Sequence, residues 1–458
     1  MNGRLRSMQG DTIDTIAAIA TPPGRGGIGI VRVSGPAVPD IAARICGRLP
    51  EPRSAIHSRF CNAASETVDE GLALYFPAPK SFTGEHVLEL HGHGGAVVMD
   101  LLLASVLEAG ARLARPGEFS QRAFLNDKMD LAQAEAVADL IDSASRTAAM
   151  CAQRTLQGEF SRRINTVVDA LVELRAYVES AIDFPEEEID FLAEGAVGER
   201  IEAILAQLET VQAEAAQGCL LREGMTVVIA GAPNVGKSSL LNRISGRDSA
   251  IVTEVPGTTR DVLREYIHLD GLPLNVVDTA GLRATQDRVE RAGIARAKAE
   301  ISTADVVLAM VDDREQNDDE VRALFVEFSH GPDFMLVRNK IDLSGSALGV
   351  RELSFGTEIR ISAKTGAGFE DLVAALKAAV GYRQAGEGSF TARRRHLEAI
   401  RAALDHGFAA KAQCGERSDG ELIAEDLRQM QRSLGEITGT FSSDDLLERI
   451  FSTFCIGK

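Results

Sequence analysis

The residues best suited to chemistry lie in a glycine-framed loop near the middle of the 458-residue chain. The phosphate-loop spacing G-x-x-x-x-G-K-[ST] is met by Gly231, Gly236, Lys237 and Ser238. The loop follows the strand-like run Val227–Ala230 and leads into a helical stretch. Backbone N–H groups in such a loop surround phosphate oxygens, the lysine contacts the outer phosphates, and the hydroxyl ligates Mg²⁺. The pattern predicts a nucleotide site.

Four shorter motifs follow this loop in a consistent order. They are Gly257–Arg260 (G-T-T-R), Asp278–Gly281 (D-T-A-G), Asn339–Asp342 (N-K-I-D) and Ser362–Lys364 (S-A-K). The first two are suited to Mg²⁺ and the outer phosphate. Asp342 can accept hydrogen bonds from the N1–H and amino groups of guanine, whereas adenine presents an acceptor at N1 and leaves the carboxylate unpaired. The five motifs together predict a GTP-binding α/β domain.

The residue after D-x-x-G shows that hydrolysis needs other groups. Ras-like switch GTPases place a glutamine there to orient the attacking water, but this chain has Leu282. An arginine finger or an equivalent positive charge raises such a rate by ~10³–10⁵. We therefore expect another positive charge and another water-positioning residue.

Hydrophobic patterns divide the chain into four segments. Residues 1–125 are mixed α/β, 126–222 helical, 223–380 α/β with short strands, and 381–458 helical again. In the first segment, Ile28–Val33 and Val87–Leu90 are strand-like, His91–Gly95 is a loop, and Ala96–Ala109 has helical periodicity. Two helical blocks around an α/β block predict one helical domain with an inserted domain.

Apolar stripes at helical spacing predict the buried faces of the helical segments. The stripes are Leu131, Ala134, Ala138 and Ile141; Ile164, Val167, Leu171, Leu174 and Val178; Ile201, Ile204, Leu208 and Val211; Leu397, Ile400 and Leu404; and Leu422, Leu427, Met430 and Leu434. Between the second and third stripes, Asp183–Phe191 holds five carboxylates, a composition typical of a solvated acidic loop.

Composition limits the compartment and the partners. Six cysteines without a C-x-x-C pair disfavour a disulfide framework and a zinc site, which favours reducing cytosol. The chain has no apolar run long enough for a membrane span, and Met1–Gly10 lacks the apolar core of a secretory signal. A net charge of −18 opposes bulk attraction to nucleic acid, although a local basic patch or a partner could still hold RNA. His91 and His93 could be metal ligands, but loop or pocket-lining histidines are the favoured interpretation.

The chain resembles the MnmE (TrmE) family of tRNA modification GTPases. The resemblance rests on the five motifs, the ends Asp11–Gly35 and Gly439–Lys458, the stretch Arg115–Asp142 and the Asp183–Phe191 loop, and the terminal Phe454–Lys458 is highly specific. It implies a multidomain α+β and α/β fold. An N-terminal folate-binding and dimerisation α+β domain would span 1–125, and a Ras-like P-loop α/β G domain at 223–380 would interrupt a helical domain.

For the G domain, the resemblance implies activation by K⁺ and by dimerisation. Asn234, Thr253, Val255 and Thr258 match the potassium site, and Ser238 and Thr259 match the Mg²⁺ ligands. Glu290 matches the carboxylate that positions water, although the residues alone would favour a solvated helix face there. The implied GTP contacts are Asn234, Val235, Gly236, Lys237, Ser238, Ser239, Thr253, Glu254, Val255, Pro256, Gly257, Thr258, Thr259, Asp278, Thr279, Ala280, Gly281, Asn339, Lys340, Asp342, Ser362, Ala363 and Lys364.

For the N-terminal domain, Arg32, Glu89, Lys128 and Lys458 match the family's contacts to a formyl-tetrahydrofolate-like ligand. A pterin edge offers donors to a carboxylate, and the folate tail offers carboxylates to Arg and Lys. The family makes Cys455 necessary for modification, as acid, base or nucleophile. A purely structural cysteine at the folate pocket remains an alternative.

The resemblance also implies a reaction and its partners. A homodimer would join the flavoprotein MnmG as a heterotetramer or larger assembly, and would install an aminomethyl or carboxymethylaminomethyl group on C5 of the tRNA wobble uridine. Its cofactors would be GTP, Mg²⁺, K⁺ and 5-formyl- or methylene-tetrahydrofolate, with no membrane partner. Arg393–His396 is a candidate basic patch for tRNA, although a helix start is favoured. The alternatives are a ribosome-assembly GTPase switch and a folate enzyme whose G domain only regulates.

Overall fold

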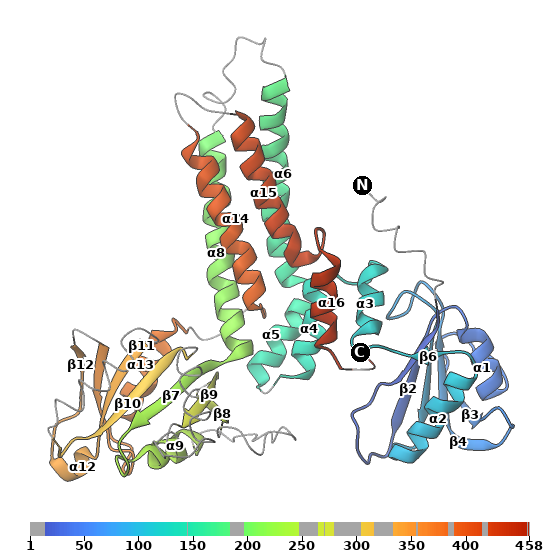
Figure 1. The fold of residues 1–458 in the computed structure, drawn as a ribbon, viewed down its shortest axis with the longest axis horizontal. Coiled ribbons are helices and arrows are strands. Elements are labelled where there is room, and N and C mark those ends of the chain that lie inside the picture. The colour runs from blue at the N-terminus through green and yellow to red at the C-terminus, as the bar shows by residue number, and fades with distance from the viewer. Residues whose placement is uncertain are drawn as a thin grey trace, which may run out of the picture. The chain divides into compact units, whose positions relative to one another are not determined.

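The computed structural model describes residues 14–143, 145–183, 197–246, 264–269, 271–278, 304–315, 333–353, 356–382, 389–414, 420–455 and 457. The chain divides into two compact units (Figure 1). The first combines Met1–Ala138 with Gln431–Lys458, and the second is Asp139–Met430. The helices α4 (Leu131–Ile141) and α15 (Gly420–Thr438) contribute residues to both.

The first unit is built on a six-stranded sheet of order β3-β4-β5-β2-β1-β6. All neighbouring strands are antiparallel except the pair β1 and β6. Its remaining elements are β1 (Ile16–Ile19), β2 (Gly29–Ser34), α1 (Val38–Cys46), β3 (Ile56–Cys61), β4 (Thr67–Phe76), β5 (Val87–Gly92), α2 (Ala96–Glu108), β6 (Arg112–Leu113), α3 (Glu118–Leu125) and α16 (Asp444–Ser452).

The two faces of this sheet differ because side chains alternate along each strand. In β2, Val31 and Val33 are buried in a core with α1 and α2, which cover that face (Figure 1). Arg32, between them, lies on the opposite face, where Phe119 of α3 packs against β1. One face therefore carries the main core, and the other carries charged and aromatic side chains.

The C-terminal helix α16 packs within the first unit. Its apolar residues Leu447, Ile450 and Phe451 form a cluster with Leu131 and Ala134 of α4. Ser443 caps α16 by accepting a hydrogen bond from the Leu446 N–H group. The end of the chain is thereby fixed on the unit that contains the N-terminal sheet.

The second unit contains a bundle of long helices. Its helices outside the sheet region are α5 (Arg146–Leu156), α6 (Glu159–Asp183), α8 (Val197–Glu223) and α14 (Arg394–Ala412), with most of α15. Helices α8 and α14 lie side by side (Figure 1). They approach closely at Gly407, where an added Cβ would lie 2.6 Å from Leu205.

The predicted stripes of α6 and α8 are confirmed, because every one of their residues is buried. Two positions elsewhere are wrong. Leu422 is 52% exposed and Ile423 takes its place in the core of α15, while Ile141 is 51% exposed at the end of α4. Leu422 is one residue out of step with the buried stripe of Ile423, Leu427, Met430 and Leu434, and Ile141 is the last residue of its helix.

The second unit also contains a seven-stranded sheet of order β12-β13-β11-β10-β7-β9-β8. The five central strands are parallel, and β8 and β12 are antiparallel edge strands. Its elements are β7 (Met225–Gly231), α9 (Lys237–Ser245), β8 (Arg264–Leu269), β9 (Leu272–Asp278), β10 (Val306–Asp312), β11 (Asp333–Asn339), α12 (Ile341–Ser344), β12 (Gly349–Leu353), β13 (Gly356–Arg360) and α13 (Phe369–Ala379).

This sheet matches the predicted α/β G domain. Buried residues alternate to its two faces: Val227 and Ile229 of β7 pack with α9 and α13, and Val228 and Ala230 pack into a second cluster. The expected fold class, an N-terminal α+β domain, a helical domain and a Ras-like α/β domain, is therefore confirmed.

Some local expectations need correction. Strand β5 runs to Gly92, so His91 belongs to a strand and not to the expected loop. Helical structure before α4 begins at Glu118, earlier than the change of character expected at Asn126. All six cysteines lie among the described residues and are free thiols. No helix within the described ranges is long and apolar enough to cross a membrane.

Candidate functional site

The phosphate loop connects the end of β7 to the start of α9. Gly231, Asn234 and Gly236 have positive φ angles of 147°, 64° and 104°, which bend the chain sharply between strand and helix. Gly236 is the N-cap of α9 and offers no side chain to the N–H groups of the first turn. Lys237 Nζ donates to the carbonyl oxygens of Gly231 and Ala232 at 2.8 and 3.0 Å, so its ammonium lies at the loop. The first turn of α9 and this ammonium can together bind an anion.

Asn339, at the end of β11, joins the phosphate loop to the S-A-K motif. This residue is only 2% exposed; its Nδ2 donates to Val235 O at 2.8 Å, and its Oδ1 accepts from Ala363 N at 2.9 Å. An added Cβ at Gly236 would lie 2.2 Å from that Nδ2 atom, so the close approach requires glycine. Three motifs far apart in the sequence therefore meet around one buried amide.

Lys340 makes a second link to the phosphate loop. Its ammonium donates to Asn234 O at 2.6 Å and to the Asp312 carboxylate at 2.8 Å. Asp312 is 4% exposed and also accepts from the Arg314 guanidinium. Hydrogen bonds from Arg314 and, against the effect of burial, from Lys340 hold the pKa of Asp312 well below its usual range. The carboxylate stays ionised and anchors the lysine.

The S-A-K loop, which is expected to cover the guanine base, is held by contacts with Asp342 and with α9. Ser362 Oγ donates to Asp342 Oδ1 at 2.6 Å, which orients the carboxylate expected to recognise guanine. Arg243 of α9 donates to the carbonyl oxygens of Ala363 and Lys364, both at 2.6 Å. The loop is therefore attached to the helix that follows the phosphate loop.

Several predicted G-domain residues can be placed. Ser238 and Ser239 lie in the first turn of α9 with exposed side chains, Asn234 is exposed in the loop, and Asp278 ends β9. Thr253, Glu254, Val255, Pro256, Gly257, Thr258, Thr259, Thr279, Ala280, Gly281 and Glu290 lie outside the described residues, as do Phe184–Phe191 of the acidic loop.

On the first unit, Arg32 and Glu89 face each other across neighbouring strands. They are paired in the β2–β5 register, and Arg32 Nε donates to Glu89 Oε1 at 3.0 Å. His91 Nε2 lies 3.3 Å from the other oxygen of Glu89. The ion pair is partly exposed, at 24% for the Arg32 side chain and 17% for that of Glu89, so both groups remain accessible.

Two aromatic rings support Arg32. Its guanidinium carbon lies 5.5 Å from the Phe82 ring centroid and 5.8 Å from that of Phe119, both within the range of cation–π attraction. Lys128 donates to Pro79 O at 3.0 Å, in the same loop as Phe82. The structure thus brings three of the four predicted folate residues around one loop, and Lys458 lies outside the described residues.

The tail that carries Cys455 is held against the same unit. Gly117 N donates to Cys455 O at 3.4 Å. An added Cβ would lie 2.4 Å from Phe451 O at Gly117 and 2.4 Å from Ile19 O at Gly457, so the tail closely contacts the start of α3 and the end of β1. Cys455 itself is exposed. Gly117, which binds the Cys455 carbonyl, lies two residues before Phe119 in the chain, and Phe119 contacts Arg32.

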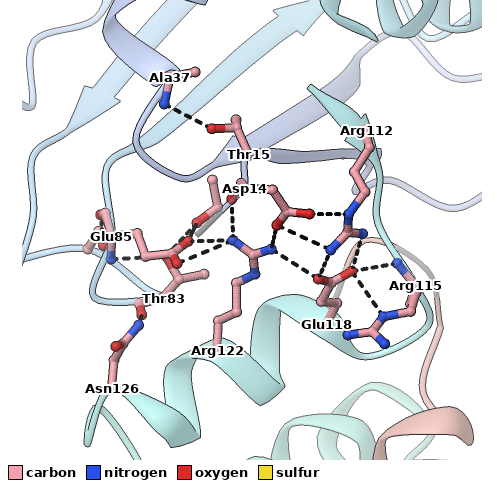
Figure 2. A network of polar contacts seen from close by, with 12 residues as sticks. Asp14, Thr15, Ala37, Thr83, Glu85, Arg112, Arg115, Glu118, Arg122 and Asn126 are labelled. Carbon is pink, nitrogen blue, oxygen red and sulfur yellow. Dashed lines mark hydrogen bonds and ion pairs between the residues drawn. The ribbon is translucent and has the colours of Figure 1, made fainter. Parts of the chain in front are cut away.

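A partly buried ionic network beside the Arg32 face is not expected from the sequence (Figure 2). Glu118 is 2% exposed and accepts from Arg112, Arg122 and the Arg115 N–H group. Asp14 accepts from the same two arginines, and Glu85 accepts from Arg122 and Ser34. These partners lie up to 108 positions apart in the chain, so no local sequence pattern predicts that they pair. The acidic and basic residue types are the only signal of this network in the sequence.

Burial alone would raise the pKa of Glu118. The hydrogen bonds from Arg112, the Arg115 N–H group and Arg122 outweigh burial and lower this pKa to about 2. The network therefore joins Asp14, two residues before β1, and Arg112 of β6 to α3 (Figure 2), and Glu85 links it to Ser34 of β2. It fixes the orientation of the helix that carries Phe119.

Two side-chain clusters whose role the sequence leaves open contain residues that pair with nearby carboxylates. His93 Nδ1 and its backbone N–H both lie 2.7 Å from the Asp69 carboxylate, which raises the pKa of His93. Within the described ranges, no three His, Cys, Asp or Glu side chains gather as a metal site. In the Arg393–His396 cluster, Arg393 pairs with Asp139 and His396 is 2% exposed, which favours the helix-start interpretation over a tRNA patch.

Comparisons with known proteins agree with this arrangement. The family described as GTP-binding protein TrmE N-terminus matches residues 15–128, and the MnmE helical domain family matches residues 131–455. The tRNA modification GTPase MnmE of Chromohalobacter salexigens is 59% identical over 452 residues, covering 97% of this chain and 98% of the relative. The protein of that name from Pseudomonas paraeruginosa is 58% identical over 453 residues, covering 97% and 99%.

Solved structures of G domains are also similar over part of the chain. The FeoB G-domain from Methanococcus jannaschii is 25% identical, with 34% of this chain and 98% of that chain covered and a TM-score of 0.26. With so low a score, this similarity adds nothing to the family assignment.

Proposed function

The chain belongs to the MnmE family of tRNA modification GTPases, and we propose that it hydrolyses GTP with K⁺ as activator and modifies the tRNA wobble uridine together with MnmG. The position modified is C5, and the group added is aminomethyl or carboxymethylaminomethyl. The one-carbon unit comes from a tetrahydrofolate derivative. The reaction takes place in the cytoplasm.

The observation that carries the GTP assignment is the buried Asn339 bridge. It brings the phosphate loop and the S-A-K loop together, while Ser362 orients Asp342 for the N1–H and amino groups of guanine. The Lys237 ammonium, held at the phosphate loop, and the first turn of α9 would bind the phosphates. An adenine base would leave the Asp342 carboxylate unpaired, so this arrangement selects GTP.

Two of the expected metal ligands lie among the described residues. Ser238 and Asn234 present exposed hydroxyl and amide oxygens at the loop, the donor type that Mg²⁺ and K⁺ prefer. Thr259 completes the Mg²⁺ ligands, and Thr253, Val255 and Thr258 complete the K⁺ site. The bound K⁺ supplies the positive charge that an arginine finger supplies in other GTPases. Glu290 positions the attacking water in place of the glutamine that Leu282 replaces.

The Arg32 face fits a reduced folate. Glu89 can accept from the donors on a pterin edge, and Arg32, Lys128 and Lys458 can bind carboxylates of the folate tail. Cys455, on a tail held at Gly117, acts on the folate carbon or on the uridine. The working assembly is a homodimer bound to MnmG, which could hold most of the tRNA and so offset the net charge of −18.

Complementation of a strain that lacks the gene tests this function. We expect hypomodified wobble uridines in the deletion strain, full modification with the wild-type gene, and none of it with Glu290→Ala. The control is Glu315→Ala, which removes an exposed carboxylate of the same domain. Nucleoside mass spectrometry of purified tRNA gives the modified fraction.

Two outcomes would contradict the proposal in different ways. Fully modified uridines in the deletion strain would exclude a modification role and favour a ribosome-assembly switch. Full modification by Glu290→Ala would mean that GTP hydrolysis only regulates a folate enzyme.

A further inference from the structure

Three consecutive residues at the start of α3 each contact a different part of the candidate folate face. Gly117 binds the C-terminal tail through Cys455 O, and Glu118 sits in the ionic network. Phe119 lies against the Arg32 guanidinium. Gly117 therefore contacts the tail that carries the cysteine expected to act on folate, Phe119 contacts a residue expected to bind folate, and Glu118 lies between these two positions in the chain.

The first contact depends on the absence of a side chain. Gly117 has φ of 66°, and an added Cβ would lie 2.4 Å from Phe451 O and 3.1 Å from Phe451 Cβ. These atoms belong to the end of α16, which leads directly into Cys455. A larger residue would push the tail away from α3.

The second contact fixes the helix. Glu118 receives hydrogen bonds from Arg112 of β6, from Arg122 one turn along α3, and from the Arg115 N–H group (Figure 2). Arg122 also donates to Asp14 Oδ1 at 2.6 Å. Since β1 begins two residues after Asp14, the first turn of α3 cannot rotate without breaking these bonds.

The third contact supports Arg32. Phe119 is fully buried among Ile16, Ala18, Ala114 and Phe82, so its ring has a fixed orientation. The Arg32 guanidinium is bound by Glu89 at its edge and lies over this ring and that of Phe82. The position and the plane of the guanidinium are therefore set by Glu89, Phe82 and Phe119 together, and Phe119 is the contribution of α3.

We propose that Gly117, Glu118 and Phe119 form one positioning element that holds Arg32 and the Cys455 tail in register for a reduced folate, a pterin with an anionic tail. This inference rests on the proposed folate-dependent function. The three residues are not catalytic, because they act through Arg32 and through the tail. They make the folate contact and the reactive cysteine dependent on the same turn of helix.

The Phe119 contact is tested by calorimetric titration of the full-length protein with 5-formyl-tetrahydrofolate. Phe119→Leu removes the aromatic face beneath Arg32 but keeps an apolar side chain, and should weaken binding about fivefold or more. The matched control is Phe60→Leu, because Phe60 is equally buried but lies in the core with α1 and α2. The control should bind within twofold of wild type, an allowance of about 0.4 kcal/mol by the affinity relation.

The Gly117 contact is tested by hydrogen exchange of the C-terminal peptide. Gly117→Ala should increase exchange in residues 451–458 about tenfold or more, because local opening exposes their N–H groups. Gly47→Ala is the control, since Gly47 has a similar φ of 75° and no atom within 4 Å of an added Cβ. That variant should leave the tail unchanged.

Equal loss of folate affinity in Phe119→Leu and Phe60→Leu, or equal exchange in Gly117→Ala and Gly47→Ala, would overturn the proposal. A wild-type protein that binds no folate would instead contradict the proposed function. The exchange measurement needs no folate, so it tests the role of α3 in either case.

Discussion

Single residues decide whether the nucleotide motifs can work together. The phosphate-loop spacing predicts Gly231 and Lys237, and the N-K-I-D motif with the hydrogen-bonding groups of guanine predicts Asp342, because each motif is local in the chain. The amide bridge of Asn339 to Val235 and Ala363 could not be predicted, because its partners lie 104 and 24 positions away. Spacing identifies the groups that bind, but not the contacts that hold them.

The close contact between Gly236 and Asn339 leads to a prediction. Gly236→Ala places a Cβ 2.2 Å from Asn339 Nδ2, so the amide must move and its two backbone partners lose their hydrogen bonds. Each buried unpaired group costs about 1–3 kcal/mol, which predicts nucleotide affinity lower by roughly a hundredfold. Titration with a fluorescent GDP analogue measures the dissociation constant.

Gly345→Ala is the matched control in the same sheet region. Gly345 also has a positive φ, of 75°, but an added Cβ there meets no atom within 4 Å. Its affinity should stay within a fewfold of wild type, by the relation of free energy to affinity. If the two variants bind GDP equally, the Asn339 bridge does not hold the site.

Helices differ in how clearly the hydrophobic pattern of their sequence predicts them. The stripes of α6 and α8 predicted long helices correctly, because every third or fourth residue meets a neighbouring helix along the whole length. The hydrophobic pattern does not predict α3, because this helix has only 8 residues and its buried side chains include Glu118 and Ser120 as well as Phe119. A short helix whose buried face includes ion-paired side chains shows little hydrophobic periodicity in the sequence.

The ionic anchoring of α3 predicts a pH dependence of local stability. The pKa of Glu118 is lowered from 4.5 to about 2, so its stabilisation is complete above pH 4.5 and is lost as pH falls toward 2. A shift of this size corresponds to a free energy on the order of 3 kcal/mol. Glu118→Gln should therefore destabilise α3 at pH 7 but much less at pH 3.

Hydrogen exchange of peptides from α3 measures this difference. Wild type and Glu118→Gln are compared at the same pH, so that intrinsic exchange rates cancel. Glu108→Gln, which changes an exposed carboxylate at the end of α2, should match wild type at both values. If the exchange rates of wild type and Glu118→Gln differed as much at pH 3 as at pH 7, the ionised Glu118 carboxylate would not be the source of this stabilisation.

At the scale of the whole molecule, the second unit must accommodate a sheet region between helices. Asp139 Oδ1 accepts from Arg222 at the end of α8 and from Arg393 just before α14, both at 2.7 Å. These two arginines lie where the chain leaves the helices for the sheet region and where it returns. The insertion was predicted from alternating segments, whereas this anchor needed contacts across 83 and 254 positions.

Asp139→Ala should loosen both ends of the insertion. The substitution removes the carboxylate that both arginines share, and removing one partner of a buried ion pair costs up to about 3–5 kcal/mol. We expect faster hydrogen exchange at the end of α8 and the start of α14, with the middle of α8 unaffected. Asp405→Asn, at an exposed position of α14, is the control. Uniformly faster exchange along α8 would indicate general unfolding and contradict a local anchor.

We propose that this chain is a potassium-activated GTPase of the MnmE family, which GTP turnover in two salts can test. GTP turnover is followed in KCl and in NaCl at equal ionic strength, over a range of protein concentrations. We expect faster turnover in KCl, with a stimulation that rises with protein concentration because the proposed activation requires two G domains to associate. Equal rates in the two salts at every concentration would contradict the potassium site at Asn234.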